Sequence, residues 1–170
     1  MTTTLHDQPV ISARRHHDAP SPQASRKLSA TVQGILVDLL ELQAQAKQAH
    51  WNISGRSFRS LHLQLDEIAS LARTQADTFA ERLRALGAAP DGTTDTVART
   101  TSLPAIPTGT LDSMDGARQI LGRLNSVSQV LRSAHPGVDR EDSATADLIN
   151  SAIEEVDKQA WLLRDQVPHS

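Results

Sequence analysis

Histidine and acidic side chains recur at helical spacing between residues 47 and 81. His62 and Asp66 are four residues apart, and Asp77 and Glu81 are separated by the same interval. Residues at this spacing project from one face of a helix. Imidazole nitrogens and carboxylate oxygens are ligands that suit iron, zinc and manganese. The spacing therefore indicates two groups of metal ligands on a single helix, although each residue taken alone could belong to an ordinary charged helix surface.

The two groups are too far apart to bind one ion within a single chain. The fifteen residues from His62 to Asp77 correspond to roughly 22 Å along a helix, whereas a metal–ligand bond is only about 2 Å long. A second copy of the helix, antiparallel across a two-fold axis, would bring Asp77 and Glu81 next to His50 and His62 of the first copy. Closed two-fold dimers are the commonest oligomers. The distance therefore predicts a metal site shared between two subunits.

A longer pattern surrounds these ligands and continues toward the C-terminus. It comprises His50-Trp51-Asn52, His62-x-x-x-Asp66-Glu67, Asp77-x-x-x-Glu81-Arg82 with Leu86-Gly87, and Asp142 to Trp161 with Thr145-Ala146-Asp147 and Asp157-Lys158. Together these residues resemble the Dps family, the mini-ferritins named as DNA-binding proteins from starved cells. The resemblance covers about residues 28–167, and all five ligand positions match.

The resemblance implies an iron-oxidising function. It places His50, His62 and Asp66 of one subunit opposite Asp77 and Glu81 of its two-fold mate, which together form the ferroxidase centre of the family. Iron is the implied metal. Fe(II) would be oxidised, preferentially by hydrogen peroxide but also by dioxygen, and ferric mineral would be stored in the cavity of a homo-dodecamer built from two-fold dimers. The implied result is protection of DNA from oxidative damage.

Trp51, Asp142 and Asp147 each have two interpretations. Trp51 follows a candidate ligand and could be a large apolar anchor that seals the end of a helix. The resemblance places it near the iron site, and the two roles are compatible. Asp142 and Asp147 stand where the last helix is expected to begin, so they could compensate the helix dipole. The resemblance places them instead at a three-fold pore, where acidic side chains would attract entering Fe(II).

Residues 1–27 are expected to form a flexible, mildly basic tail. The segment has no sustained apolar period and contains three prolines, and its basic side chains are Arg14, Arg15, Arg26 and Lys27. The whole chain has a formal net charge of −3, so non-specific DNA binding would have to come from this tail. The alternative function is a nucleoid DNA-compacting protein with iron oxidation as a secondary activity. A structural bundle without metal would leave the ligand pattern unexplained.

Composition narrows the remaining possibilities. A chain of 170 residues is typical of one domain. It contains no cysteine, which excludes disulfides and thiolate metal sites and fits a reducing cytoplasm. No apolar run approaches the length of a membrane span, and the N-terminus lacks the apolar stretch of a secretory signal. We therefore expect a cytoplasmic protein without a membrane partner, with association with the nucleoid as an option.

Apolar periodicity predicts an all-α, ferritin-like four-helix bundle with a long crossover between the second and third helices. Within residues 88–111, prolines, glycines and threonines indicate a loop, whereas the resemblance implies a short extra helix in residues 95–100. No Glu-x-x-His motif occurs, so the di-iron motif that other ferritin-like bundles build within one subunit is missing. The bundle is expected to span residues 28–167, followed by a short end at residues 168–170.

The ends of the four helices are predicted from capping and stop signals. The first helix follows Ser25 or Ser29 and runs from residue 28 to about 53. The second is capped by Ser57 and ends near residue 86, and the third begins at residue 112 or 113. His135-Pro136-Gly137 is expected to stop the third helix at about residue 134. The fourth begins between residues 139 and 143 and continues to about residue 166.

Overall fold

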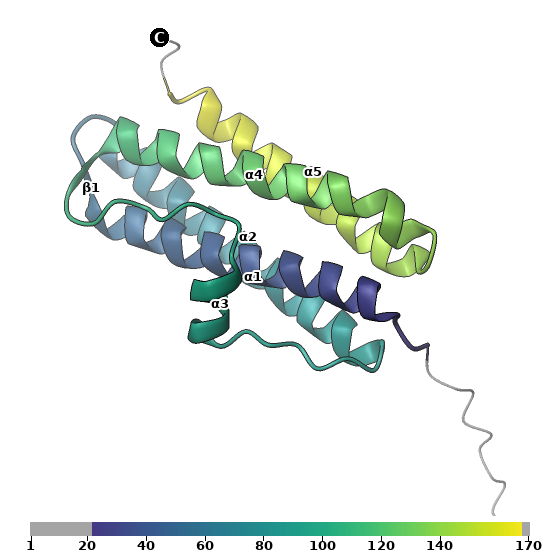
Figure 1. Cartoon of the computed structure of the whole chain (residues 1–170). Coiled ribbons are helices and arrows are strands. Elements are labelled where there is room, and N and C mark those ends of the chain that lie inside the picture. Colours follow the sequence, from purple (N-terminus) through teal and green to yellow (C-terminus); the bar gives the residue numbers. More distant parts are fainter. Residues whose placement is uncertain (1–21, 168–170) are drawn as a thin grey trace, which may run out of the picture.

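The computed structural model describes residues 22–167, and most of them are helical (Figure 1). This confirms the predicted all-α, ferritin-like four-helix bundle. The crossover after the second long helix carries the short helix that the resemblance implied. The elements in chain order are α1 (Arg26–Asn52), β1 (Ile53–Ser54), α2 (Phe58–Ala85), α3 (Thr94–Thr100), β2 (Leu111–Asp112), α4 (Ser113–Asp139) and α5 (Ser143–Arg164).

The four long helices pack as two antiparallel pairs around one core. Helix α1 packs along α2 and helix α4 along α5, and the pairs meet where α1 contacts α4 and α2 contacts α5. The core is built from Leu, Ile, Val and Ala, with Phe79 as its fully buried aromatic side chain. Burying each large aliphatic side chain contributes about 1.5–3 kcal/mol. Within residues 22–167, none of the helices has both the length and the apolar character needed to cross a bilayer.

Helix α1 begins two residues earlier than expected because Ser25 is held firmly at its N-terminus. The Ser25 hydroxyl accepts a hydrogen bond from the backbone N–H of Leu28 at 3.1 Å. The backbone N–H and hydroxyl of Ser25 donate to the two carboxylate oxygens of Glu141, at 2.7 and 2.8 Å. Arg26 and Lys27 therefore belong to the first turn of α1, and their assignment to the flexible tail was wrong.

Helix α4 does not stop at Pro136, contrary to the prediction from the His-Pro-Gly sequence. It continues to Asp139 with the proline inside its last turn. A proline removes one backbone hydrogen bond, but here Val138 is buried in the core, and its carbonyl accepts from the N–H groups of Glu141 and Asp142. Tertiary packing thus extends the helix to a tight corner with α5 at residues 140–142.

Ser57 occupies the position before α2, as predicted, but it does not cap the helix with its side chain. Its hydroxyl makes no capping bond, and its backbone is left-handed with φ of 57°. The turn between α1 and α2 sets the backbone conformation of Ser57. Strands β1 and β2 pair in parallel, Ile53 with Leu111 and Ser54 with Asp112, and the Ser113 hydroxyl donates to the carbonyl of Arg56. The α1–α2 turn is therefore fastened to the start of α4.

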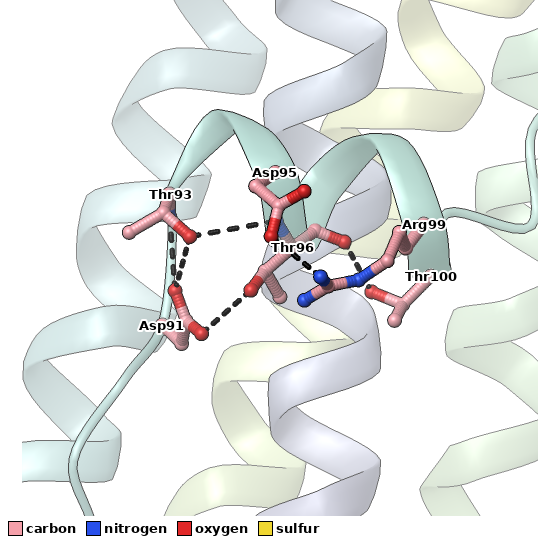
Figure 2. A network of polar contacts seen from close by, with 6 residues as sticks. All are labelled: Asp91, Thr93, Asp95, Thr96, Arg99 and Thr100. Atoms are coloured by element: carbon pink, nitrogen blue, oxygen red, sulfur yellow. Dashed lines mark hydrogen bonds and ion pairs between the residues drawn. The ribbon is translucent and has the colours of Figure 1, made fainter.

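A polar network organises the crossover around α3 (Figure 2). The Asp91 carboxylate accepts hydrogen bonds from Thr96 Oγ1 at 2.6 Å and from both the N–H and Oγ1 of Thr93. These hydrogen bonds, that of Thr96 foremost, lower the pKa of Asp91. The backbone of Asp91 is joined to α1 by two hydrogen bonds with the Gln33 side chain, at 2.7 and 3.0 Å.

Two buried charged side chains fasten the second half of the crossover. Asp38 on α1 accepts from the Thr101 hydroxyl and from the N–H and hydroxyl of Ser102. Arg123 on α4 donates to the side chain of Gln45 and to the carbonyls of Pro104 and Ala105. Burial lowers the pKa of Arg123. Because each charge is satisfied by several partners, the crossover has a defined path over α1.

The close packing of the α1–α2 turn on α4 predicts a position-specific cost for adding one methyl group. A Cβ at Gly116 would lie 2.6 Å from Ile53 Cγ2, whereas at Gly122 of the same helix no described atom lies within 4 Å. We expect Gly116→Ala to lower the free energy of unfolding by about 1–3 kcal/mol. Gly122→Ala should be neutral or stabilise by up to about 1 kcal/mol.

The measurement is denaturant unfolding at one fixed chain concentration, because association shifts apparent stability. Equal effects of Gly116→Ala and Gly122→Ala would contradict the close contact between Gly116 and Ile53.

Candidate metal centre

His50 and His62 form a reciprocal pair where α1 and α2 lie side by side. The Nδ1 atom of His50 is 2.7 Å from the backbone carbonyl oxygen of His62, and Nδ1 of His62 is 2.9 Å from the carbonyl oxygen of His50. The two rings stack with their centroids 3.6 Å apart, and the ring of Phe58 lies 5.1 Å from that of His62. Two helices are thus joined by the same side chains that were predicted as ligands.

These hydrogen bonds determine which nitrogen of each histidine can bind a metal. A carbonyl oxygen only accepts, so Nδ1 of each ring must carry the proton and donate it. The Nε2 atom of each neutral ring then keeps its lone pair. A backbone carbonyl on the far nitrogen is a common way of orienting a metal-ligating histidine. The pair therefore presents two Nε2 donors from one stacked unit.

Asp66 lies one turn after His62 and is paired with a lysine of α1. Lys47 Nζ on α1 is 2.5 Å from Asp66 Oδ1, and both side chains are partly exposed. The hydrogen bond from Lys47 lowers the pKa of Asp66, and it outweighs the opposing effect of burial. The charge of Lys47, with those of His50 and His62 when these rings are protonated, lowers the pKa further. Lys47 stands three residues before His50, on the same helix face, and this spacing could have indicated Lys47 as the partner of Asp66. Its role becomes visible only in the folded structure.

Asp77 and Glu81 lie farther along α2, away from the histidine pair. Both are exposed, and neither side chain forms a hydrogen bond or ion pair with another residue in the range 22–167. In that same part of the chain, no three His, Asp or Glu side chains come close enough to hold an ion together. One copy of the chain therefore brings His50 and His62 together, with Asp66 one turn farther along α2, and leaves Asp77 and Glu81 apart from them.

One member of each group, Asp66 and Asp77, nevertheless opens onto the same face of the molecule. A depression between α1 and α2 of about 210 Å³ is lined by Lys47, Asp66 and Arg73. A larger groove of about 600 Å³ continues along the same two helices and is lined by Arg73 and Asp77. Because Arg73 borders both, the two depressions are adjacent. We call this surface the α1–α2 face.

The structure places Trp51 differently from a sealing anchor. Its side chain is 68% exposed, so the expectation that it seals the helix end within its own chain was wrong. It borders a surface depression of about 470 Å³ together with Ala44, Gln48 and Ile106. Trp51 lies directly after His50 in α1 and belongs to the neighbourhood of the histidine pair.

The structure ties Asp142 to α2 and leaves Asp147 on the surface. Arg82 Nη2 is 2.6 Å from Asp142 Oδ2, and Arg82 Nε donates to Thr145 Oγ1 at 2.9 Å. Burial by itself raises the pKa of Asp142, but the hydrogen bonds from Thr145 and Arg82, with the charge of Arg82, lower it overall. Asp142 therefore acts within one chain as a structural partner of Arg82, whereas Asp147 is exposed on the first turns of α5.

The basic residues predicted to bind DNA divide between two regions. Arg14 and Arg15 lie outside the described residues. Arg26 and Lys27 are exposed on the first turn of α1, next to the corner between α4 and α5.

Comparison with known proteins identifies the class of bundle. Residues 30–169 match the family model described as a ferritin-like domain. The DNA protection during starvation protein of Agrobacterium fabrum is 33% identical over 156 residues, which cover 89% of this chain and 93% of that protein. The crystal structure of Dps92 from Deinococcus radiodurans superposes with a TM-score of 0.80 at 32% identity, covering 82% of this chain and 85% of that one.

A second solved structure gives the same result. Dps from Microbacterium arborescens in the high iron form has a TM-score of 0.79 at 30% identity, covering 85% of this chain and 97% of that one. These similar proteins are all Dps proteins, which form one group within the ferritin-like family. The chain belongs to the Dps family of ferritin-like proteins.

The contact between Lys47 and Asp66 generates a prediction about protonation. Lys47→Met removes the hydrogen bond and the charge that lower the pKa of Asp66, so this carboxylate should take up its proton at a higher pH than in the parent protein. Infrared titration of the carboxylate band measures the shift, with Asp66→Asn identifying the contribution of Asp66. Lys158→Met, which removes an exposed lysine of α5, should leave the titration unchanged. An unaltered Asp66 titration in Lys47→Met would contradict the assigned cause.

Proposed function

We propose that the protein is a ferroxidase and iron-storage protein whose iron sites are shared between two subunits. The observation that carries the proposal is the division of the ligand set. The His50–His62 pair and Asp66 lie toward one end of the helix pair α1–α2, while Asp77 and Glu81 stand exposed farther along α2. An antiparallel second copy would join the two groups twice, once at each end of the face.

The donor set suits Fe(II) as a substrate. Two neutral imidazole nitrogens and three carboxylates form the mixture of nitrogen and oxygen donors typical of non-haem iron. The Nδ1–carbonyl bonds orient both Nε2 atoms, and the lowered pKa of Asp66 keeps that carboxylate ionised. Since Lys47 already occupies one oxygen of Asp66, an arriving cation competes with its ammonium group.

The proposed reaction is oxidation of Fe(II), with hydrogen peroxide as the preferred oxidant and dioxygen as the second. Hydrogen peroxide accepts two electrons as its O–O bond breaks, and two Fe(II) ions supply one electron each. The products are two Fe(III) ions and two hydroxide ions, which become water on protonation. Because both electrons are delivered at one site, no free hydroxyl radical is released. The protein's contribution is to hold Fe(II) beside the oxidant.

Two relatives support this proposal by their names. The protein of Agrobacterium fabrum is a DNA protection during starvation protein, and the Microbacterium arborescens Dps structure is of a high iron form. We extend both properties to this chain. Ferric mineral would collect in the cavity of a shell of twelve chains, so that removing Fe(II) and peroxide together protects DNA in the cytoplasm.

Compaction of DNA is a second candidate function, favoured by the distribution of basic residues. The whole chain carries a formal net charge of −3, whereas residues 1–25 are formally neutral and place the neighbouring Arg14 and Arg15 away from their two acidic residues, Asp7 and Asp18. Many copies of this segment on one particle would bind a duplex with added avidity. Arg26 and Lys27, at the start of α1, would add fixed positive charge beside each segment.

The divided site predicts rescue between two inactive variants. His62→Ala and Glu81→Ala should each slow Fe(II) oxidation by about tenfold or more, since even losing an outer partner of a metal ligand costs about 10–100-fold. When the two variants are co-expressed, each mixed two-fold pair rebuilds one intact site. Random pairing should therefore restore about a quarter of the sites. The measurement is the initial rise of ferric absorbance after adding peroxide to protein equilibrated with Fe(II).

A second co-expressed pair controls for the effect of combining two variants in one particle. His62→Ala co-expressed with Asp66→Ala should restore nothing, because both changes fall in the same half of the site. His135→Ala, outside the candidate centre on α4, should oxidise Fe(II) at the parental rate. Equal rates for the two co-expressed pairs would show that the site does not combine halves from different chains.

Removal of residues 1–21 should abolish DNA binding without affecting iron oxidation. This deletion retains Ser25 and the backbone bond from Ala24 to Leu86, so α1 keeps its anchors. Replacing both Arg14 and Arg15 by alanine should reduce the slope of log K against log[salt] by about 1.8 per chain engaged. Gel shifts over a salt series provide the measurement. Undiminished binding by the truncated particle would assign DNA binding to another surface, such as Arg26 and Lys27.

A further inference from the structure

Arg73 stands on the α1–α2 face without a counter-charge from the described part of its own chain. Its side chain is exposed, and within residues 22–167 it forms neither an ion pair nor a hydrogen bond. Lys47, the other cationic side chain at the smaller depression of this face, is already paired with Asp66. The donors of the Arg73 guanidinium are therefore available to a ligand.

The depression beside Arg73 is small and largely polar. It measures about 210 Å³ and lies between α1 and α2, which line it with Gln43, Lys47, Asp66, Ala69, Ser70 and Arg73. A water molecule takes up roughly 30 Å³ of the liquid. The depression therefore has room for a few molecules of that size, and its ligand must be correspondingly small.

Arg73 and Asp66 border this depression from opposite ends. They are seven residues apart on α2, which is almost two full turns and a rise of about 10.5 Å, so both project from nearly the same side of the helix. Helical side chains point toward the helix N-terminus, so the side chain of Arg73 extends toward Asp66. The two groups nevertheless do not form an ion pair, and the depression lies between them.

The lining of the depression suits a neutral ligand that both donates and accepts hydrogen bonds. An anion would be attracted by Arg73 but repelled by the carboxylate of Asp66. That carboxylate accepts hydrogen bonds and the guanidinium donates them, while the Gln43 amide and the Ser70 hydroxyl do both. Hydrogen peroxide matches such a lining, because each of its two O–H groups can donate one hydrogen bond and accept others.

We propose that this depression binds hydrogen peroxide and that Arg73 is the main residue that binds it. The inference rests on the proposed function, because it takes Asp66 as an iron ligand and peroxide as the oxidant. Asp66 belongs both to the depression and to the ligand set, so peroxide held there lies next to the Fe(II) that it oxidises. Holding both reactants side by side removes part of the entropic barrier to their reaction.

Arg73 also supplies positive charge where the reaction develops negative charge. As the O–O bond of peroxide breaks, two Fe(II) ions give up one electron each, and two hydroxide ions form from the two oxygens. A guanidinium stays protonated throughout. Arg73 therefore stabilises the developing hydroxide by its charge and its hydrogen bonds, without having to release a proton of its own.

The same lining discriminates between the two oxidants. Polar surfaces of this kind are hydrated, and a ligand that displaces ordered water without reproducing its hydrogen bonds loses affinity. Hydrogen peroxide reproduces those bonds, whereas dioxygen is apolar and forms none of comparable strength. Binding beside Arg73, Gln43 and Ser70 would therefore give the proposed preference for peroxide a physical cause.

Comparing the rates with the two oxidants tests the role of Arg73. Arg73→Met removes the charge and the donors of this side chain. We expect its KM for hydrogen peroxide to rise by about tenfold or more, as for the loss of a hydrogen bond to a charged group. The rate with dioxygen should stay close to that of the parent protein. Arg73→Lys keeps the charge and should retain more of the peroxide reaction than Arg73→Met.

The measurement is stopped-flow ferric absorbance of the Fe(II)-loaded particle over a series of peroxide concentrations, repeated with dioxygen. Arg164→Met removes an exposed arginine of α5 outside the depression and should match the parent protein with both oxidants. Ser70→Val fills the depression without changing its charge. It should also raise the KM for peroxide selectively, and it provides the test if Arg73→Met does not assemble.

Two further measurements separate peroxide binding from assembly and from iron binding. Particle mass and anaerobic Fe(II) binding should be the same in Arg73→Met as in the parent protein. In iron-free particles with isotope-labelled arginine, adding peroxide should shift a guanidinium infrared band of the parent protein. The same addition should cause no such shift in Arg73→Met.

The outcomes distinguish this proposal from the proposed function. If Arg73→Met forms the normal particle and slows oxidation by both oxidants equally, or by neither, then Arg73 does not bind peroxide, and the shared iron site is unaffected by that result. If the parent protein fails to oxidise Fe(II) with either oxidant, the proposed function is wrong. The infrared shift of the iron-free particle then decides by itself whether the depression binds peroxide.

Discussion

The reciprocal bonds between His50 and His62 are the constraint on which the candidate site depends. Each imidazole donates to the backbone carbonyl of the other residue, so a shift of α1 along α2 by even one residue would break both bonds. Helix packing alone allows a range of positions, because ridges and grooves repeat along each helix. The pair selects one of them. It also leaves both Nε2 atoms available, so the contact that aligns the helices prepares the two nitrogen ligands.

Polar contacts elsewhere in the bundle fix the crossover against α1. Gln33, Asp38 and Arg123 bond to it, and its residues Pro90 and Gly92 border the groove of the α1–α2 face. Asp38 and Arg123 are charges placed in a low-dielectric interior, where an unpaired charge is costly. Each has several hydrogen-bond partners in the crossover. Displacing that segment would leave both charges unsatisfied, which explains how 25 residues without a long helix follow a defined path.

Much of the fold could be predicted because its information is local. Apolar residues at helical spacing locate the four long helices to within a few residues, and the five candidate ligands were predicted from residue type and interval. The predictions were wrong where contacts between residues distant in the chain outweigh a signal in the local sequence. Pro136 stops an isolated helix, but the burial of Val138 carries α4 past it. Arg26 and Lys27 read as part of a polar tail, but Glu141, more than a hundred residues away, holds Ser25 and starts the helix before them. Trp51 read as an anchor within the chain, yet it is exposed.

The sequence by itself determined the helical bundle, and it predicted a ligand set divided into two groups, since these depend on residue type and on the rise of a helix. Only the tertiary structure decided which nitrogen each histidine presents, that Lys47 pairs with Asp66 and lowers its pKa, and that Arg82 engages Asp142. These contacts join residues 12 to 60 positions apart in the chain. No periodicity encodes them, because they depend on how one helix is rotated and shifted against another, which is decided by the packing of the whole core.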